Sequence, residues 1–269
     1  MVDDTLDLST PIVWSSEEEQ RAAVAFFNAA FRAEESGLRQ AHELSSDVAK
    51  WDPELAECLQ LYGDEEGWHR ELLTKFLPWL GGEVKPMGRV TGTFYKLYAR
   101  ADRMETIVLT NLMFETIGST TYRLALGRVT HPTIRQMLTI LTRDESFHVP
   151  LNVHFLRSIR DRDGHRDALR LQAIHDGLFV ALLGSAYASR RRAKAFDHIT
   201  FKELSHAYAD QLARLFAHEP DLRLRPPSLV LRAIGIDPRS IYEGEAIGAT
   251  SVEAAERAAD RENVQVSAM

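Results

Sequence analysis

A doubled arrangement of glutamate and histidine constrains the fold of this chain more than any other feature. Two Glu-x-x-His pairs occur, and each follows a single glutamate by about 30 residues. The residues are Glu34 with Glu66 and His69, and Glu115 with Glu145 and His148. A four-helix bundle builds a two-metal site in its core from this pattern, since two helices supply one glutamate each and two supply a Glu-x-x-His pair. The pattern therefore predicts an all-α bundle with six metal ligands.

Long segments with helical periodicity fill the sequence, and glycine and proline are concentrated between them. Ser15-Ser16 before three glutamates predicts a helix start, and so does Asp52-Pro53. We expect helices over residues 17–49, 53–76, 102–126, 132–159, 166–192 and 201–217, with short helices over 91–101 and after residue 226. The separation of 49 positions between the second and third glutamates of the pattern predicts a long crossover between the second and third long helices.

No low-complexity tract or proline-rich linker interrupts residues 17–235. We therefore predict one helical domain over 17–235, preceded by an N-terminal extension over residues 1–16. Residues 236–269 are polar and rich in alanine, which favours a flexible C-terminal tail.

The direction in which each glutamate faces decides between neighbouring candidates. Residues three, four and seven positions from Glu34 are apolar or small, and include Phe31 and Gly37. Arginine, asparagine and histidine neighbour Glu35 instead. Glu34 is therefore predicted to face the interior and Glu35 the solvent. Glu115 has apolar and small neighbours and is predicted to face inward as well.

A third Glu-x-x-His pair shows that the motif alone is weak evidence. Glu203 and His206 have no partner glutamate at the right distance, and they flank the apolar stripe of their predicted helix. We expect this pair to lie near solvent without metal. His175 lies among apolar residues of the fifth long helix, where a satisfied core histidine is favoured over a role beside the metals.

Composition excludes several classes of protein. The net charge of −7 is unlike that of a general nucleic-acid binder. The single cysteine, Cys58, excludes a disulfide scaffold and a cysteine-held iron–sulfur centre, and it is expected to pack as a small helix residue. The first 16 residues lack the basic flank and apolar core of a signal peptide, and no apolar run approaches the ~20 residues needed to cross a bilayer. We expect a cytoplasmic protein without a membrane span.

The ligand order resembles that of the ferritin-like di-iron carboxylate superfamily. The segments Asp64-Glu65-Glu66-Gly67-Trp68-His69 and Arg143-Asp144-Glu145-Ser146-Phe147-His148 carry the resemblance, which covers about residues 17–160. It implies a ferritin-like four-helix bundle, followed here by additional C-terminal helices. It also implies two iron ions, or one manganese and one iron, that react with dioxygen.

At two positions the chain differs from particular branches of this superfamily, which reduces the number of branches that it resembles. Leu73 stands where radical-generating ribonucleotide reductase subunits place a tyrosine, and Leu141 where aminobenzoate-type N-oxygenases place a third histidine. The ligand pattern is closest to aldehyde-deformylating oxygenases and acyl desaturases. In related monooxygenases a hydroxyl residue follows the third-helix glutamate by one turn, and Ser119 holds that place. Ser119 is the candidate catalytic residue, with a small polar packing residue as the competing interpretation.

These observations favour an oxidase or oxygenase that acts on a small, mostly apolar organic substrate. An apolar channel is expected around the small residues 118–121, lined by Phe27, Phe31, Leu112, Phe114 and Phe147. Electrons would come from an external donor such as a ferredoxin with its reductase, because the chain has no flavin or iron–sulfur motif. The oligomeric state stays open, with a homodimer as one candidate. The alternative is a ferritin-like protein that stores or detoxifies iron without an organic substrate.

Overall fold

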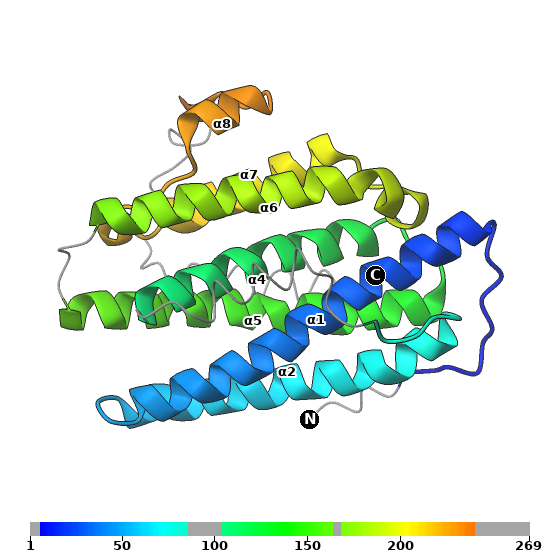
Figure 1. Ribbon diagram of the computed structural model, residues 1–269, viewed down its shortest axis with the longest axis horizontal. Helices are drawn as coiled ribbons and strands as arrows, with labels where there is room; N and C mark the ends of the chain where they lie inside the picture. Colours follow the sequence, from blue (N-terminus) through cyan, green and yellow to red (C-terminus); the bar gives the residue numbers. More distant parts are fainter. Residues whose placement is uncertain (1–5, 86–103, 164–167, 240–269) are drawn as a thin grey trace. The chain divides into compact units, whose positions relative to one another are not determined.

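The computed structural model describes residues 6–85, 104–163 and 168–239, and these ranges contain helices and no strand (Figure 1). The helices are α1 (Glu17–Val48), α2 (Pro53–Trp79), α4 (Met104–Leu126), α5 (Pro132–Asp163), α6 (Ala168–Asp197), α7 (Phe201–Ala217), the 3₁₀-helix η1 (Pro220–Leu222) and α8 (Ser228–Ala233). The all-α class predicted from the sequence is confirmed for this part of the chain. The predicted short helix over 91–101, most of the crossover and most of the tail lie outside the described residues.

Polar caps fix the helix starts that the sequence predicts. The Ser16 hydroxyl accepts a hydrogen bond from the Glu19 amide at 3.1 Å, which satisfies one of the open N–H groups of the first turn. The Asp52 carboxylate accepts from the Leu55 amide at 3.0 Å, and Pro53 occupies the first helical position. Both helices therefore begin at the predicted residues.

Three helices end later than the sequence predicts, and one of them, α5, reaches Asp163 instead of residue 159. Helix α2 continues through Pro78, whose missing N–H costs one hydrogen bond close to the helix end, and Gly81 then leaves the helix with a φ of +82°. Helix α6 continues to Asp197, five residues beyond the predicted end. There Phe196 packs against Phe26 with ring centroids 5.4 Å apart, so a tertiary contact extends the helix.

The chain divides into two compact units. Unit 1 comprises residues 1–100, 128–137 and 192–198, and unit 2 comprises residues 101–127, 138–191 and 199–269. Each unit is described by itself below. The prediction of one domain over 17–235 stays a prediction.

Unit 1 is built around an antiparallel hairpin of α1 and α2 (Figure 1). Contacts pair residues at matching distances from the turn. They run from Ser45 with the Ala56 carbonyl, through His42 with Asp64, Glu34 with His69 and Phe27 with Phe76, to Gln20 with the Leu80 carbonyl. The short link at residues 49–52 enforces this register. The N-terminal extension reaches the first turn of α5, where the Thr133 hydroxyl donates to the Asp7 carbonyl at 2.9 Å.

Unit 2 packs the helices that follow. Helix α7 lies against α4, where the Gln211 side chain accepts hydrogen bonds from Thr120 at 2.5 Å and Arg123 at 3.2 Å. Helix α6 joins α7 through stacked rings of Phe179 and Tyr208, 5.5 Å apart. No helix in the described ranges has both the length and the apolar character needed to cross a bilayer.

Candidate metal centre

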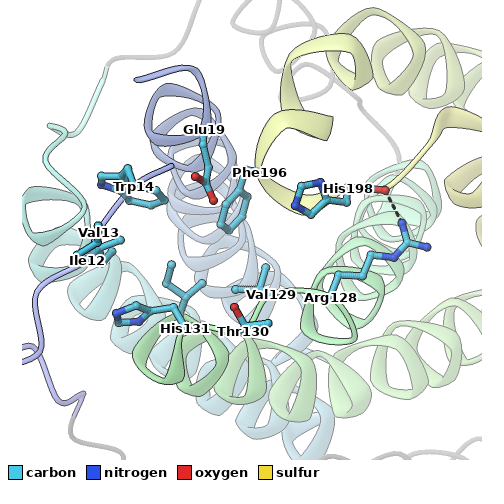
Figure 2. A pocket seen from close by; sticks show the side chains of 11 residues that line it. Ile12, Val13, Trp14, Glu19, Arg128, Val129, Thr130, His131, Phe196 and His198 are labelled. Carbon is cyan, nitrogen blue, oxygen red and sulfur yellow. Dashed lines mark hydrogen bonds between the residues drawn. The ribbon is translucent and has the colours of Figure 1, made fainter. Parts of the chain in front are cut away.

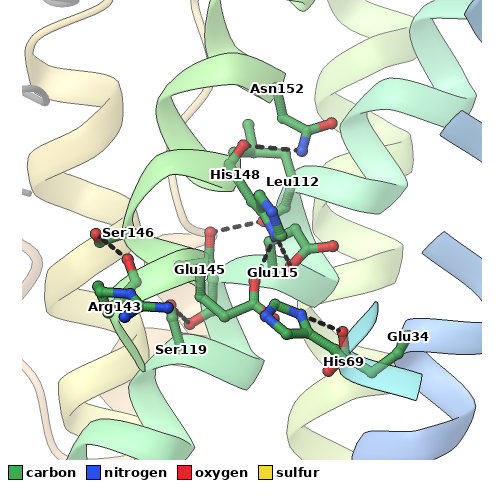
Figure 3. Close-up of polar contacts among 11 residues, drawn as sticks. Glu34, His69, Leu112, Glu115, Ser119, Arg143, Glu145, Ser146, His148 and Asn152 are labelled. Atoms are coloured by element: carbon green, nitrogen blue, oxygen red, sulfur yellow. Dashed lines mark hydrogen bonds and ion pairs between the residues drawn. The ribbon is translucent and has the colours of Figure 1, made fainter. Parts of the chain in front are cut away.

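The first predicted triad is assembled within unit 1 by the α1–α2 hairpin. The Nδ1 atom of His69 lies 3.1 Å from Oε2 of Glu34 (Figure 3). Glu34, Glu66 and His69 each offer one ligand atom, and these atoms lie within 4.8 Å of one another. All three side chains are buried, with exposed fractions of 0–2%. Glu66 and His69 share one face of α2 because they are three residues apart.

The predicted directions of Glu34 and Glu35 are confirmed by burial. The Glu34 side chain is 1% exposed, whereas the Glu35 side chain is 50% exposed and lies 3.9 Å from Arg70 in a surface ion pair. A turn of 100° per residue separates these two glutamates. Glu34 therefore points into the interior, and Glu35 points toward solvent.

Gly37 makes room for the carboxylate of Glu66. A Cβ atom built on Gly37 would lie 2.8 Å from Cδ of Glu66 and 3.0 and 3.1 Å from its two oxygens. These distances are shorter than ordinary van der Waals contact, which begins at 3.4 Å. The absence of a side chain at position 37 is therefore needed for the carboxylate to occupy its place. Gly37 follows Glu34 by one turn, so α1 supplies both a ligand and the space for another.

The second triad is assembled within unit 2 by α4 and α5. The Nδ1 atom of His148 lies 3.2 Å from Oε2 of Glu145 and 3.9 Å from Oε2 of Glu115 (Figure 3). Glu145 and His148 are 3% and 2% exposed, and the Glu115 side chain is 13% exposed. The predicted inward direction of Glu115 is therefore confirmed within this unit. Within unit 2, His148 therefore lies close to two carboxylates, those of Glu145 and Glu115.

The aspartates that precede the two Glu-x-x-His pairs behave differently, and sequence reasoning missed this. Asp64 is exposed and lies 3.0 Å from Nε2 of His42. Asp144 is 3% exposed and accepts hydrogen bonds from Nε of Arg143 at 2.5 Å and from its Nη2 at 2.9 Å. Such a two-pronged pair fixes both side chains and holds the buried charge of Asp144. The available signal was the arginine directly before Asp144, which has no counterpart before Asp64.

Ser119 lies one turn after Glu115 and is 7% exposed. Its hydroxyl donates to the Thr116 carbonyl at 3.3 Å. Thr116 on the same helix also donates to the Leu112 carbonyl, four residues before it, at 2.6 Å. Hydroxyls of this kind often bond back to helix carbonyls, so the packing interpretation gains support. The catalytic role of Ser119 stays a prediction.

The third Glu-x-x-His pair has other partners. Glu203 and Thr200 form a reciprocal capping box at the start of α7, in which the Glu203 carboxylate accepts from the Thr200 amide at 2.8 Å. His206 has its Nε2 atom 2.8 Å from the Ile234 carbonyl. Both side chains therefore serve helix and loop structure.

His175 is fully buried in α6, as predicted for a core histidine. Its Nδ1 atom lies 3.2 Å from the carboxylate of Asp176, and its ring contacts Phe216 with centroids 5.3 Å apart. Its Nε2 atom has no hydrogen-bond partner among the described residues, so only one ring nitrogen is satisfied. Burial lowers the pKa of His175, and the neighbouring Asp176 opposes this effect in part.

The predicted apolar channel is only partly compatible with the structure. Phe27 and Phe31 are buried in unit 1, and Leu112 is buried in unit 2. Phe147 is 52% exposed, and the prediction that it lines the channel is wrong. Phe147 follows Glu145 by two positions, which is about 200° around the helix, so its side chain points away from the side that carries Glu145. The channel itself stays a prediction.

Comparisons of the chain with protein-family models, with curated proteins and with solved structures found no match. The interpretation of the site therefore depends on its chemistry. Buried carboxylates are costly unless charges or hydrogen bonds compensate them. Carboxylate oxygen and imidazole nitrogen suit divalent iron and manganese, and two carboxylates would neutralise one such ion in each triad. The donor set of each unit therefore fits a divalent metal ion.

Proposed function

We propose that this protein is a di-metal oxidase or oxygenase that uses dioxygen on a small, mostly apolar organic substrate. The observation that carries the proposal is the buried cluster of Glu34, Glu66 and His69, with Gly37 leaving space for one carboxylate. The position of His148 beside Glu145 and Glu115 in unit 2 supports the same chemistry. The proposal includes a ferritin-like bundle in which the two triads share one pair of ions, and this part rests on the sequence resemblance.

Each residue has a defined role in the proposed site. Glu34, Glu66 and His69 would hold one ion, and Glu115, Glu145 and His148 the other. Four carboxylates balance the charge of two divalent ions, so the loaded site is formally neutral. The Asp144–Arg143 pair would fix the start of the segment that carries Glu145 and His148.

The bound metals would supply the reduction of dioxygen, with an external protein donor delivering electrons. The chain's part is to keep this chemistry away from water. The apolar side chains one turn from a ligand in each unit, such as Leu73 after His69 and Leu112 before Glu115, are fully buried. An apolar surrounding favours an apolar substrate over a charged one.

Iron storage or detoxification is the alternative function, because ferritin-like proteins can bind iron with the same ligands. The two functions differ in stoichiometry and in their response to an organic substrate. The purified protein is loaded anaerobically with ferrous iron, and oxygen uptake is then followed with and without a panel of small apolar compounds. Two irons per chain, with oxygen uptake accelerated by a particular compound, support the oxidase. Uptake of many irons per chain without a compound effect contradicts it.

Matched variants identify the ligands in the same assay. Glu66→Ala and Glu145→Ala should each reduce iron binding strongly, because each removes a buried carboxylate from a triad. Glu65→Ala is the control for the first, since Glu65 is its direct neighbour on α2 and is not in the triad. Glu203→Ala tests the third Glu-x-x-His pair and should leave iron binding intact. Loss of iron in Glu203→Ala would show that the wrong pairs had been chosen.

A further inference from the structure

Helix α6 has one face that packs within unit 2 and a second face that is exposed. The packed face carries Leu178 and Phe179, and Phe179 stacks on Tyr208 of the neighbouring helix α7 (Figure 1). The exposed face carries six residues at alternating separations of four and three positions, which we call the α6 seam: Ala173, Gly177, Val180, Gly184, Tyr187 and Arg191. This spacing sets side chains along one line of a helix, and it is the spacing with which two helices pack side by side.

The α6 seam stops where contacts within the chain begin. Beyond Arg191 the ring of Phe196 packs against Phe26, and the His198 carbonyl accepts a hydrogen bond from Arg128 (Figure 2). The end of α6 is therefore already engaged, whereas the seam residues are all exposed.

The exposed seam lacks the polar character of an ordinary surface helix. Val180 and Tyr187 are 51% and 70% exposed, and no residue of α6 between Asp176 and Arg190 is charged. The ring of Tyr187 is positioned by an edge-on contact with Phe201, with centroids 5.2 Å apart. The solvent-facing side of a surface helix normally carries charged and polar residues. Apolar side chains gathered on an exposed face instead mark an interaction surface.

Two glycines of the α6 seam have no use within the described chain. A Cβ atom built on Gly177 or Gly184 would meet no described atom within 4 Å, apart from adjacent residues and the backbone of its own helix. Gly37 differs, because a Cβ there would strike the Glu66 carboxylate. A glycine inside a helix is less favourable than alanine, since it leaves the backbone more conformational freedom to lose. The space that Gly177 and Gly184 leave on the surface suits the close approach of a partner from outside the chain.

The large and small residues of the α6 seam complement those of a second α6 that runs in the opposite direction. Position 182 is the midpoint between Val180 and Gly184, and also between Gly177 and Tyr187. Antiparallel pairing about this position sets Val180 against Gly184 of the second copy. It sets Tyr187 against Gly177 of the second copy, so each large side chain enters the space that a glycine leaves. Two-fold symmetry makes each of these contacts occur twice.

The charges at the two ends of the seam select the same direction. The run Arg190-Arg191-Arg192 follows the uncharged part of α6, and a parallel pair would set this run against itself. In the antiparallel pair Arg191 lies level with Ala173 of the second copy, which is within one turn of Asp176 there. The Asp176 side chain is 40% exposed and can receive this charge. The antiparallel arrangement therefore replaces a repulsion by an attraction.

We propose that the α6 seam binds a second copy of this chain through an antiparallel, two-fold contact between the two α6 helices. One helix from each copy forms an interface at the small end of the usual range, so the dissociation constant should be roughly 1–100 μM. The seam contains none of the proposed metal ligands. The dimer is therefore independent of the proposed metal chemistry.

The test is sedimentation velocity on the full-length chain over a series of concentrations from about 1 to 300 μM, which brackets a weak protein contact. The average mass should rise from that of one chain toward that of two. Gly184→Gln places a long side chain in the space that Val180 of the second copy would enter, and it should keep the mass of one chain throughout. Ser185→Gln is the matched control, because Ser185 is exposed and is turned about 100° from Gly184. It should associate like the unchanged protein.

Urea unfolding verifies that the Gly184→Gln chain is folded. Its free energy of unfolding should be no lower than that of the unchanged chain, because glutamine is the better helix residue and meets no described neighbour there. The proposal is overturned if the unchanged protein has the mass of one chain at every concentration. It is also overturned if Gly184→Gln associates as strongly as Ser185→Gln.

A charge reversal then tests the direction of the two helices. Arg191→Glu brings a negative charge toward Asp176 of the second copy in the antiparallel pair, and it should weaken association about threefold or more. A parallel pair would respond in the opposite way, because the new glutamate would lie within the arginine run of the second copy. Association that is unchanged or strengthened in Arg191→Glu would therefore contradict the antiparallel contact.

Discussion

Replacing Gly37 by alanine should weaken iron binding while leaving the fold intact. The added Cβ would stand 2.8 Å from Cδ of Glu66, which is 0.6 Å less than the 3.4 Å of ordinary contact. The atom that it meets is at the far end of a flexible side chain, so the carboxylate can move aside at small cost. Metal–ligand distances in proteins tolerate deviations of only about 0.2 Å. A displacement of about 0.6 Å therefore takes the Glu66 carboxylate out of bonding position.

Iron affinity and stability should respond differently in Gly37→Ala. Ferrous iron affinity should fall by about 10- to 100-fold, the range found when a contact that orients a metal ligand is lost. The free energy of unfolding without metal should not fall, because alanine is favoured over glycine within a helix by about 1 kcal/mol. Affinity is measured by anaerobic titration with ferrous iron, and stability by urea unfolding monitored by circular dichroism.

Gly67→Ala provides the matched control on the facing helix. A Cβ on Gly67 would approach only the side chain of Leu38, at 3.4 Å or more, so helix propensity improves without a clash. Gly67→Ala should gain stability and keep iron. If Gly37→Ala binds iron as tightly as the unchanged protein, the Glu66 carboxylate does not act from this position and the reasoning is refuted.

Three further predictions follow from single residues. Glu34→Ala should lose iron while Glu35→Ala keeps it, as measured by metal content after anaerobic loading, and equal losses would contradict the inward direction of Glu34. Burial lowers the pKa of His175 in the folded state, so the unfolded chain takes up the proton first and stability falls as the pH drops below the ordinary histidine value of about 6.5. His175→Phe should flatten this acid dependence in urea unfolding at a series of pH values, and an unchanged slope would assign it to other groups. Thr200→Ala should lower the free energy of unfolding by about 1 kcal/mol through loss of the capping box, with iron content unchanged.

Local signals in the sequence were enough to place most helices. A capping side chain and a proline at the first helical position act within a few residues, so the starts of α1 and α2 could be predicted from Ser16 and Asp52-Pro53. The end of α6 could not be predicted, because Phe196 continues that helix through contacts with residues 170 positions earlier in the chain. Such a tertiary contact leaves no trace in the neighbouring residues.

The ligands could be predicted because helix geometry relates spacing to facing. Glu34 and Glu35 have the same chemistry, and only the pattern of their neighbours three and four residues away distinguishes them. The spacing of apolar neighbours does not predict which partners the aspartates near the ligands contact. Asp64 lies two residues before Glu66 and is exposed beside His42, whereas Asp144 lies directly before Glu145 and is buried against Arg143. The prediction for Phe147 was wrong because it relied on the apolar side chain and not on the direction of that position on the helix.

We propose that the two triads hold one coupled pair of metal ions. Mössbauer spectroscopy of protein loaded with ⁵⁷Fe and then oxidised tests it directly, since two irons about 3.5–4 Å apart interact magnetically. The proposal predicts two irons per chain with the diamagnetic spectrum of a coupled ferric pair. Loss of either triad, through Glu66→Ala or Glu145→Ala, should abolish that spectrum. Two magnetically independent ferric ions, or one iron per chain, would contradict the claim.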